Sequence, residues 1–157
     1  LYKLCYFSQG WKLAWTGCPL FQEPLQAWAN GPIPIALRDR NKPGGDSTNL
    51  TTTELRTIES VVDFYRDKDF AELSQLSRGK AWKEARRNLP DNAHSQEVLS
   101  VTTMREEFTD LLHSTPNVPS CPPRALIPEN YSLETALAAI AEIEKTWGGT
   151  LALLATR

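Results

Sequence analysis

Residues 1–21 read LYKLCYFSQGWKLAWTGCPLF, and this stretch decides the fold. Its apolar side chains recur every three or four residues, at Leu1, Leu4, Cys5, Phe7, Trp11, Ala14 and Trp15. That spacing places them on one face of a helix. Gly17 can adopt the left-handed conformation that ends a helix, and Pro19 cannot continue one. The pattern therefore predicts an α-helix over residues 1–16.

Helical spacing continues through the middle of the chain. Thr51 and Glu54 have the spacing of a capping box, and they open a helix expected to end near residue 66. Two shorter helices are expected around residues 70–76 and 82–89, and a second capping-box pair, Thr103 and Glu106, opens another. In that helix, Glu106 and Glu107 are interpreted as a negative first turn that favours the helix dipole. The predicted core is Leu4, Phe7, Trp11, Leu13, Phe21, Trp28, Leu55, Ile58, Val62, Leu73, Trp82 and Phe108.

A short two-stranded element is the only β-structure expected. Residues 25–28 alternate apolar and polar side chains, and residues 98–101 are a short apolar piece that could pair with them. Residues 30–32 form a turn signal, and residues 35–40 could form one or two helical turns. The expected fold class is mainly α: a compact helical domain with a possible two-stranded β element and a C-terminal helical appendage.

The chain divides at a proline-rich stretch. Five prolines between residues 114 and 128 favour an extended backbone, so residues 113–131 are interpreted as a linker after a domain spanning 1–112. Residues 132–157 are expected to form a helix with one apolar face and an apolar tail. Because residue 1 is Leu rather than Met, we expect the natural chain to begin further upstream.

Composition excludes several classes of function. The 157 residues carry a formal net charge of −2, so a generally basic nucleic-acid binder is not expected. No apolar run approaches the roughly 18 residues of a membrane span. Three cysteines without metal-ligand spacing favour a reducing cytoplasm. No phosphate-binding loop or common hydrolase motif occurs, so we expect no enzyme, cofactor or metal. An enzyme that uses Cys18 and a loop histidine stays open as a minor alternative.

The N-terminal block resembles a known family. Residues 4–21, LCYFSQGWKLAWTGCPLF, resemble the opening motif of the Panacea antitoxin domain, the SocA-like antitoxin family. Looser similarity follows at Ala27-Trp28, at Gly31-Pro32, over residues 81–86 and over residues 101–112. The resemblance implies the antitoxin half of a type II toxin–antitoxin system, which neutralises a cognate toxin by direct protein–protein binding without an enzymatic step. An adaptor that delivers or restrains another protein is the alternative reading.

Candidate partner contacts are aromatic and basic. Tryptophan and arginine often contribute much of the binding energy of protein interfaces. The predicted contact residues are therefore of these two types, with one neighbouring asparagine: Trp15, Trp28, Asn30, Arg38, Arg40, Trp82 and Arg86. A basic cluster of Arg78, Lys80, Lys83, Arg86 and Arg87 fits a phosphate or an acidic partner, or only a solvated helix face. The assembly could be a homodimer or a heterotetramer with the toxin.

Overall fold

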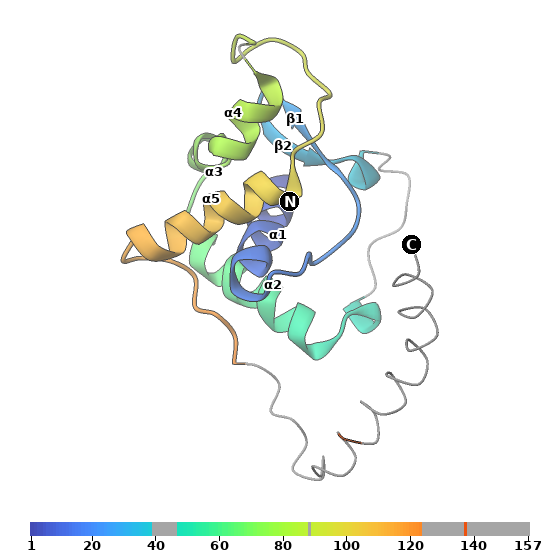
Figure 1. The fold of residues 1–157 in the computed structure, drawn as a ribbon, viewed down its shortest axis with the longest axis vertical. Coiled ribbons are helices and arrows are strands. Elements are labelled where there is room, and N and C mark those ends of the chain that lie inside the picture. The colour runs from blue at the N-terminus through green and yellow to red at the C-terminus, as the bar shows by residue number, and fades with distance from the viewer. Residues whose placement is uncertain (39–46, 88, 124–136, 138–157) are drawn as a thin grey trace, which may run out of the picture. The chain divides into compact units, whose positions relative to one another are not determined.

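The computed structural model describes residues 1–38, 47–87, 89–123 and 137 (Figure 1). Residues 1–122 form one compact unit, and a second unit begins at Pro123. Helices dominate the first unit, with one small antiparallel sheet, so the expected fold class is confirmed. The helix and apolar tail predicted for residues 132–157 lie outside the described residues, apart from Leu137. Among the described helices, none combines the length and apolar character that crossing a membrane requires.

The N-terminal helix forms as its spacing predicts. Helix α1 spans Tyr2–Thr16, and Gly17 follows with a φ of 72°. The Gly17 amide donates to the carbonyl of Leu13 at 2.8 Å, which closes the last turn. This left-handed conformation favours glycine because a Cβ atom would crowd the following carbonyl. The helix end is therefore fixed by local sequence.

The sheet is a hairpin, and the predicted pairing of residues 25–28 with residues 98–101 is confirmed only in part. Strand β1 (Leu25–Trp28) pairs antiparallel with β2 (Gly31–Pro34), from Leu25 opposite Pro34 to Trp28 opposite Gly31. Residues 97–99 do reach the other edge of β1, but only through one isolated bridge between Gln26 and Val98. Strand β2 was not predicted because it contains two prolines, which disfavour strands. Proline is tolerated there because β2 is an edge strand. A short 3₁₀ turn, Ile35–Leu37, follows the hairpin.

Four more helices complete the unit. Helix α2 spans Thr52–Tyr65, and its predicted capping box between Thr51 and Glu54 is present. Helices α3 (Phe70–Leu76) and α4 (Lys80–Arg86) are one to two turns long, and α5 spans Val101–Ser114. The predicted cap of α5 at Thr103 is wrong, because the hydroxyl of Ser100 accepts from the Thr103 amide and caps the helix three residues earlier. The two glutamates therefore lie in its second turn.

An aromatic cluster forms the core between α1, α2 and α5. Phe108 of α5 packs edge-on against Trp11 and Tyr6 of α1, with ring centroids 5.2 and 5.4 Å apart. The Phe7 ring stacks on Tyr65 at 4.2 Å, and the hydroxyl of Tyr65 accepts from the Trp11 indole nitrogen at 3.1 Å. Each ring therefore finds apolar area, and the buried indole N–H finds an acceptor.

The predicted core is confirmed in its centre and corrected at its edge. Five members are buried: Phe7, Trp11, Leu13, Trp82 and Phe108. Five others are half-buried: Leu4, Phe21, Trp28, Ile58 and Leu73. Leu55 and Val62 are exposed, because α2 turns a different face inward, which carries Thr57, Val61 and Tyr65. These three residues are four positions apart, so they lie along one helical stripe.

Candidate partner-binding surfaces

Trp28 forms the centre of an aromatic and basic surface beside the hairpin. Its half-buried ring has the Arg38 guanidinium 5.3 Å from its centroid and the His94 ring at 5.4 Å. Its indole nitrogen donates to Gln26 Oε1 at 2.9 Å, which fixes the orientation of the ring. Arg38 and His94 are both exposed. Two predicted contact residues, Trp28 and Arg38, thus come together in one patch.

Trp82 and Arg86 lie beneath this surface and are buried. The Trp82 indole nitrogen donates to the Trp28 carbonyl at 2.8 Å. Arg86 donates to the carbonyls of Ala27 at 3.0 Å and Ala93 at 2.8 Å, and its guanidinium lies 4.7 Å from the Trp82 ring centroid. These two side chains hold the hairpin and the loop after α4 together, so they support the Trp28 surface from within the fold. Their contact with a partner stays a prediction.

The remaining predicted contact residues are separate from this patch. Asn30 is exposed in the turn between β1 and β2. The hairpin lies beside the first turn of α1, because Lys3 Nζ donates to the Pro32 carbonyl at 3.2 Å. Trp15 lies three turns further along that helix, half-buried and stacked on Trp11. Arg40 lies outside the described residues.

An apolar groove, which sequence reasoning missed, opens beside α5. It has a volume of about 590 Å³ and lies between α1, α2, α5 and the junction of α3 with α4. Buried rings of Phe7, Trp11 and Phe108 line it, and two exposed leucines, Leu76 and Leu111, stand at its edges. We name it the α5 groove. The sequence signal was a set of apolar helix positions that were assigned to the core instead.

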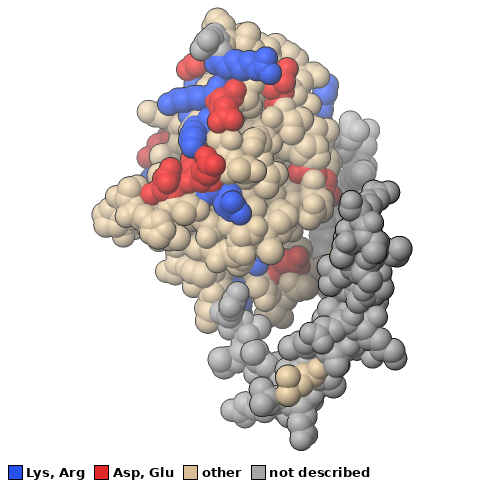
Figure 2. All heavy atoms as spheres, in the orientation of Figure 1, with Lys and Arg blue, Asp and Glu red and all other residues tan. Residues whose placement is uncertain are grey.

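The last turn of α5, residues 111–114, carries no lysine, arginine or carboxylate, although Lys68, Lys80, Glu107 and Asp110 line other parts of the groove. Figure 2 shows lysine, arginine and carboxylate side chains gathered over α3, α4 and the beginning of α5, while the C-terminal end of α5 is uncharged. One ion pair in the charged region joins Lys80 to Glu106 at 2.8 Å. The cores of protein interfaces are depleted in charged residues, so the uncharged end of α5 is the more suitable surface for apolar docking.

Comparison with known protein families identifies the family of this chain. The family model described as antitoxin SocA-like, Panacea domain, matches residues 1–83. The chain belongs to the SocA-like antitoxin family. No significant match to a curated protein or to a solved structure is found. The matched residues comprise α1, the hairpin, α2, α3 and the first half of α4, so the Panacea domain is confirmed over that part.

The Panacea domain supplies only part of the α5 groove. Phe7, Trp11 and Leu76 fall within the matched residues, whereas Phe108 and Leu111 of α5 follow them. The groove therefore joins the family segment to a helix that lies beyond the match.

A buried carboxylate joins the groove to the Panacea domain. Glu107 is 8% exposed and lines the groove. Its Oε1 accepts from the Tyr6 hydroxyl at 3.1 Å, and its Oε2 accepts from the Ala81 amide at 2.7 Å. Burial raises the pKa of this carboxyl above its ordinary value, and the two hydrogen bonds oppose the rise. The expectation that Glu107 lies in a negative first turn is therefore wrong, because α5 begins at Val101 and the Glu107 side chain is buried against α1 and α4.

Proposed function

We propose that this chain is an antitoxin that binds a cognate toxin protein and neutralises it without an enzymatic step. Family membership supports the general role, and the α5 groove is the single observation that supports binding as the mechanism. An open apolar groove with aromatic walls suits a segment of another protein. We place the complex in the cytoplasm, where the free cysteines of this chain would stay reduced.

The groove can supply binding energy because its edge leucines are exposed in the free protein. Leu76 is 48% exposed and Leu111 is 38% exposed. Covering the exposed part of each side chain stabilises a complex by about 1 kcal/mol, since complete burial of a leucine is worth roughly 2 kcal/mol. The aromatic walls are already packed, so they offer a preorganised surface that need not be ordered on binding.

The test is neutralisation of the product of the adjacent reading frame. Leu111→Asp places a charge at the groove edge and should weaken the complex by roughly 100-fold, because a charge buried in an apolar interface loses its hydration. Growth rescue on co-expression should be lost in parallel. Val62→Asp is the matched control, since Val62 is equally exposed but lies on α2 and does not line the groove.

Each outcome bears on the proposal. Loss of rescue with Leu111→Asp but not with Val62→Asp supports neutralisation through the groove. Full rescue by both variants would remove the groove from the mechanism. A neighbouring product that is harmless alone would contradict the antitoxin function. If the partner's half-life in cells shortens when this chain is present, the adaptor reading replaces simple neutralisation.

A further inference from the structure

A second hollow of the unit carries charged and amide side chains beside the apolar Phe70 and Ala71. It lies between the turn of the hairpin, α3 and α4, and has a volume of about 540 Å³. The side chains that line it include two amides, two cations and one carboxylate: Asn30, Gln75, Arg78, Lys83 and Asp91. We name it the Arg78 hollow. It shares none of its lining residues with the α5 groove.

Two hydrogen-bond donors that line this hollow have no acceptor among the described residues. Ser74 is only 6% exposed, and its hydroxyl is buried without a hydrogen-bond partner. The Nε of Arg78 is likewise buried and without an acceptor. Buried polar groups are nearly always hydrogen-bonded, and one left unsatisfied costs about 1–3 kcal/mol. Both residues line the Arg78 hollow, so two side chains of its wall carry donors that no acceptor among the described residues satisfies.

Positive charge around the hollow exceeds the negative charge. Asp91 is the one carboxylate among the described residues that line it, and its Oδ2 stays 3.7 Å from Arg78 Nη1, which exceeds hydrogen-bond distance. Lys83 makes no ion pair within the described residues. Lys3 is 5% exposed, and among the described residues its ammonium donates a hydrogen bond to the carbonyl of Pro32 alone.

Lys3 and Arg78 are close enough for their charges to interact. Burial first, and the charge of Arg78 second, lower the pKa of Lys3 to about 8. A second contact holds Arg78 in place, because its guanidinium lies 5.5 Å from the centroid of the Trp82 ring. An anion beside Arg78 would therefore relieve repulsion between two cations that the fold has already positioned.

We propose that the Arg78 hollow binds a single oxyanion, either a phosphate group or a carboxylate. Arg78 presents a planar fork of donors that matches both groups, Lys83 adds a mobile ammonium, and the amides of Asn30 and Gln75 add neutral donors. A free phosphate at this site does not depend on the proposed function. A carboxylate supplied by a toxin side chain does rest on it, and would make the hollow a second point of contact.

The test is a titration of the full chain with two probes, inorganic phosphate and acetate, at constant ionic strength. Binding is followed in proton–nitrogen correlation spectra through the signals of α3, α4 and the hairpin turn. Arg78→Gln and Lys83→Gln should each weaken phosphate binding by about tenfold, because each removes a charged donor. Lys83 is exposed, so its replacement leaves folding intact even if Arg78→Gln does not.

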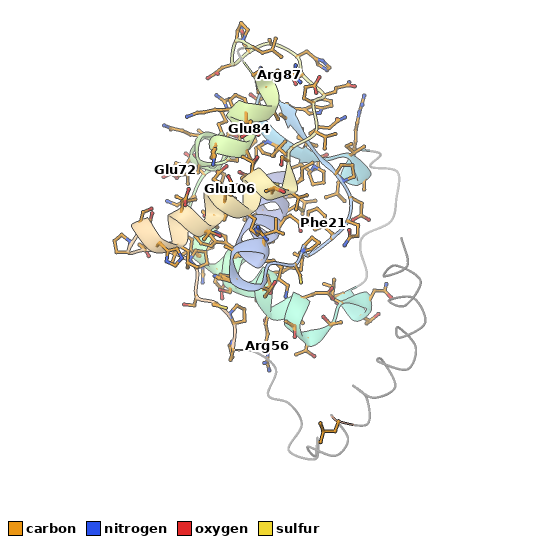
Figure 3. All side chains as sticks on the ribbon, in the orientation of Figure 1. Phe21, Arg56, Glu72, Glu84, Arg87 and Glu106 are labelled. Carbon is orange, nitrogen blue, oxygen red and sulfur yellow. The ribbon has the colours of Figure 1, made fainter. Side chains whose placement is uncertain are left out.

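Arg56→Gln is the matched control. Arg56 is exposed on α2, at the opposite end of the unit from α4, as the positions of Arg56 and Arg87 in Figure 3 show. It removes the same charge and should leave binding unchanged. Constant ionic strength keeps the screening of charges the same in all titrations, so differences between variants do not arise from salt.

Every result of this titration decides the proposal. Saturable shifts with phosphate that weaken in the Lys83 variant support a phosphate site. Saturable shifts with acetate alone support a carboxylate site and point to an acidic side chain of a partner. Shifts that do not saturate with either probe, or that persist equally in Arg78→Gln and Lys83→Gln, would overturn the proposal. Since no toxin is present, this failure is separate from failure of the antitoxin function.

Discussion

The Tyr6 hydroxyl donates to Glu107 Oε1 at 3.1 Å, across 101 positions of sequence. The other oxygen of the same carboxylate accepts from the amide of Ala81. Since Tyr6 belongs to α1, Ala81 to α4 and Glu107 to α5, one side chain joins three helices where the α5 groove has its floor. Removing its charge should therefore change stability in a pH-dependent way.

Glu107→Gln should remove a component of the pH dependence of stability. Burial raises the pKa of Glu107 above 4.5 in the folded protein, so the folded state keeps this proton to higher pH than the unfolded chain does. The resulting stabilisation is complete below pH 4.5 and is lost as pH rises through the folded-state pKa. The glutamine can keep both hydrogen bonds, with its oxygen on Ala81 and its amide on Tyr6.

The measurement is urea unfolding of the wild type and Glu107→Gln over a series of pH values from 4.5 upward. The free energy of unfolding of the wild type should fall relative to that of the variant as pH rises. The exposed carboxylates contribute equally to the pH dependence of both proteins, so their contribution cancels in the difference. A difference that stays constant with pH would show that the carboxyl is not perturbed.

Gly10→Ala should destabilise the protein, against the usual trend within helices. Replacing a helical glycine by alanine normally stabilises by about 0.5–1 kcal/mol. At Gly10, however, the new Cβ would overlap the ring of Phe108 on α5. We expect a loss of about 2 kcal/mol, typical of overpacking, measured by thermal or urea unfolding.

A double-mutant cycle separates this clash from other effects. Phe108→Leu makes room for the new methyl group, so Gly10→Ala should be less destabilising in that background than in the wild type. Gly17→Ala is a second comparison, since nothing lies within 4 Å of its added Cβ and only the positive φ opposes it. Additivity of the Gly10 and Phe108 changes would contradict the predicted contact.

Arg86→Lys should be strongly destabilising although it keeps the charge. The guanidinium donates to the carbonyls of Ala27, Pro90 and Ala93, and an ammonium cannot reach these divergent acceptors together. The buried Ala27 carbonyl left unpaired costs about 1–3 kcal/mol, and the bonds to Pro90 and Ala93 are weakened as well, so we expect a loss of about 3 kcal/mol in unfolding experiments. Arg87→Lys is the matched control, because the neighbouring Arg87 is exposed, and it should stay within about 0.5 kcal/mol of the wild type.

Lys3→Met should change how the stability of the protein depends on pH in the alkaline range, because it removes the buried ammonium. The pKa of Lys3 is lowered from 10.5 to about 8 in the folded protein. Between these values the unfolded chain holds the proton that the folded state has released, so wild-type stability should rise with pH relative to Lys3→Met. Below pH 8 this relative gain is absent. Parallel stability curves of the two proteins from pH 8 to 10.5 would show that Lys3 is hydrated instead.

Local signals made several elements predictable. The glycine that ends α1 and the Thr51–Glu54 capping box act over a few residues, and both lie where the pattern placed them. The Panacea resemblance was also readable from consecutive residues of the first helix, and the family match confirms it over residues 1–83. The prediction of a second capping box at Thr103 was wrong, because Ser100, three residues earlier, is an equally good capping residue.

The candidate surfaces were harder to predict because burial depends on distant partners. Trp82 and Arg86 are residue types that often anchor protein interfaces. Here they are buried instead, because they donate hydrogen bonds to carbonyls of β1 and of the loop after α4. Leucine is a residue type typical of protein cores, yet Leu111 is exposed at the edge of the α5 groove. Side-chain type alone does not distinguish these two outcomes.

The sequence by itself determined the helical class, the end of the first helix and the family, since these depend on spacing and on neighbours along the chain. Only the tertiary structure decided which face of α2 turns inward, that Glu107 joins three helices, and that Arg78 and Lys3 lie near each other. Those relationships arise when segments far apart in the chain pack together. Periodicity specifies that a helix has an apolar face, but the shape and hydrogen-bonding groups of its neighbours specify what that face meets.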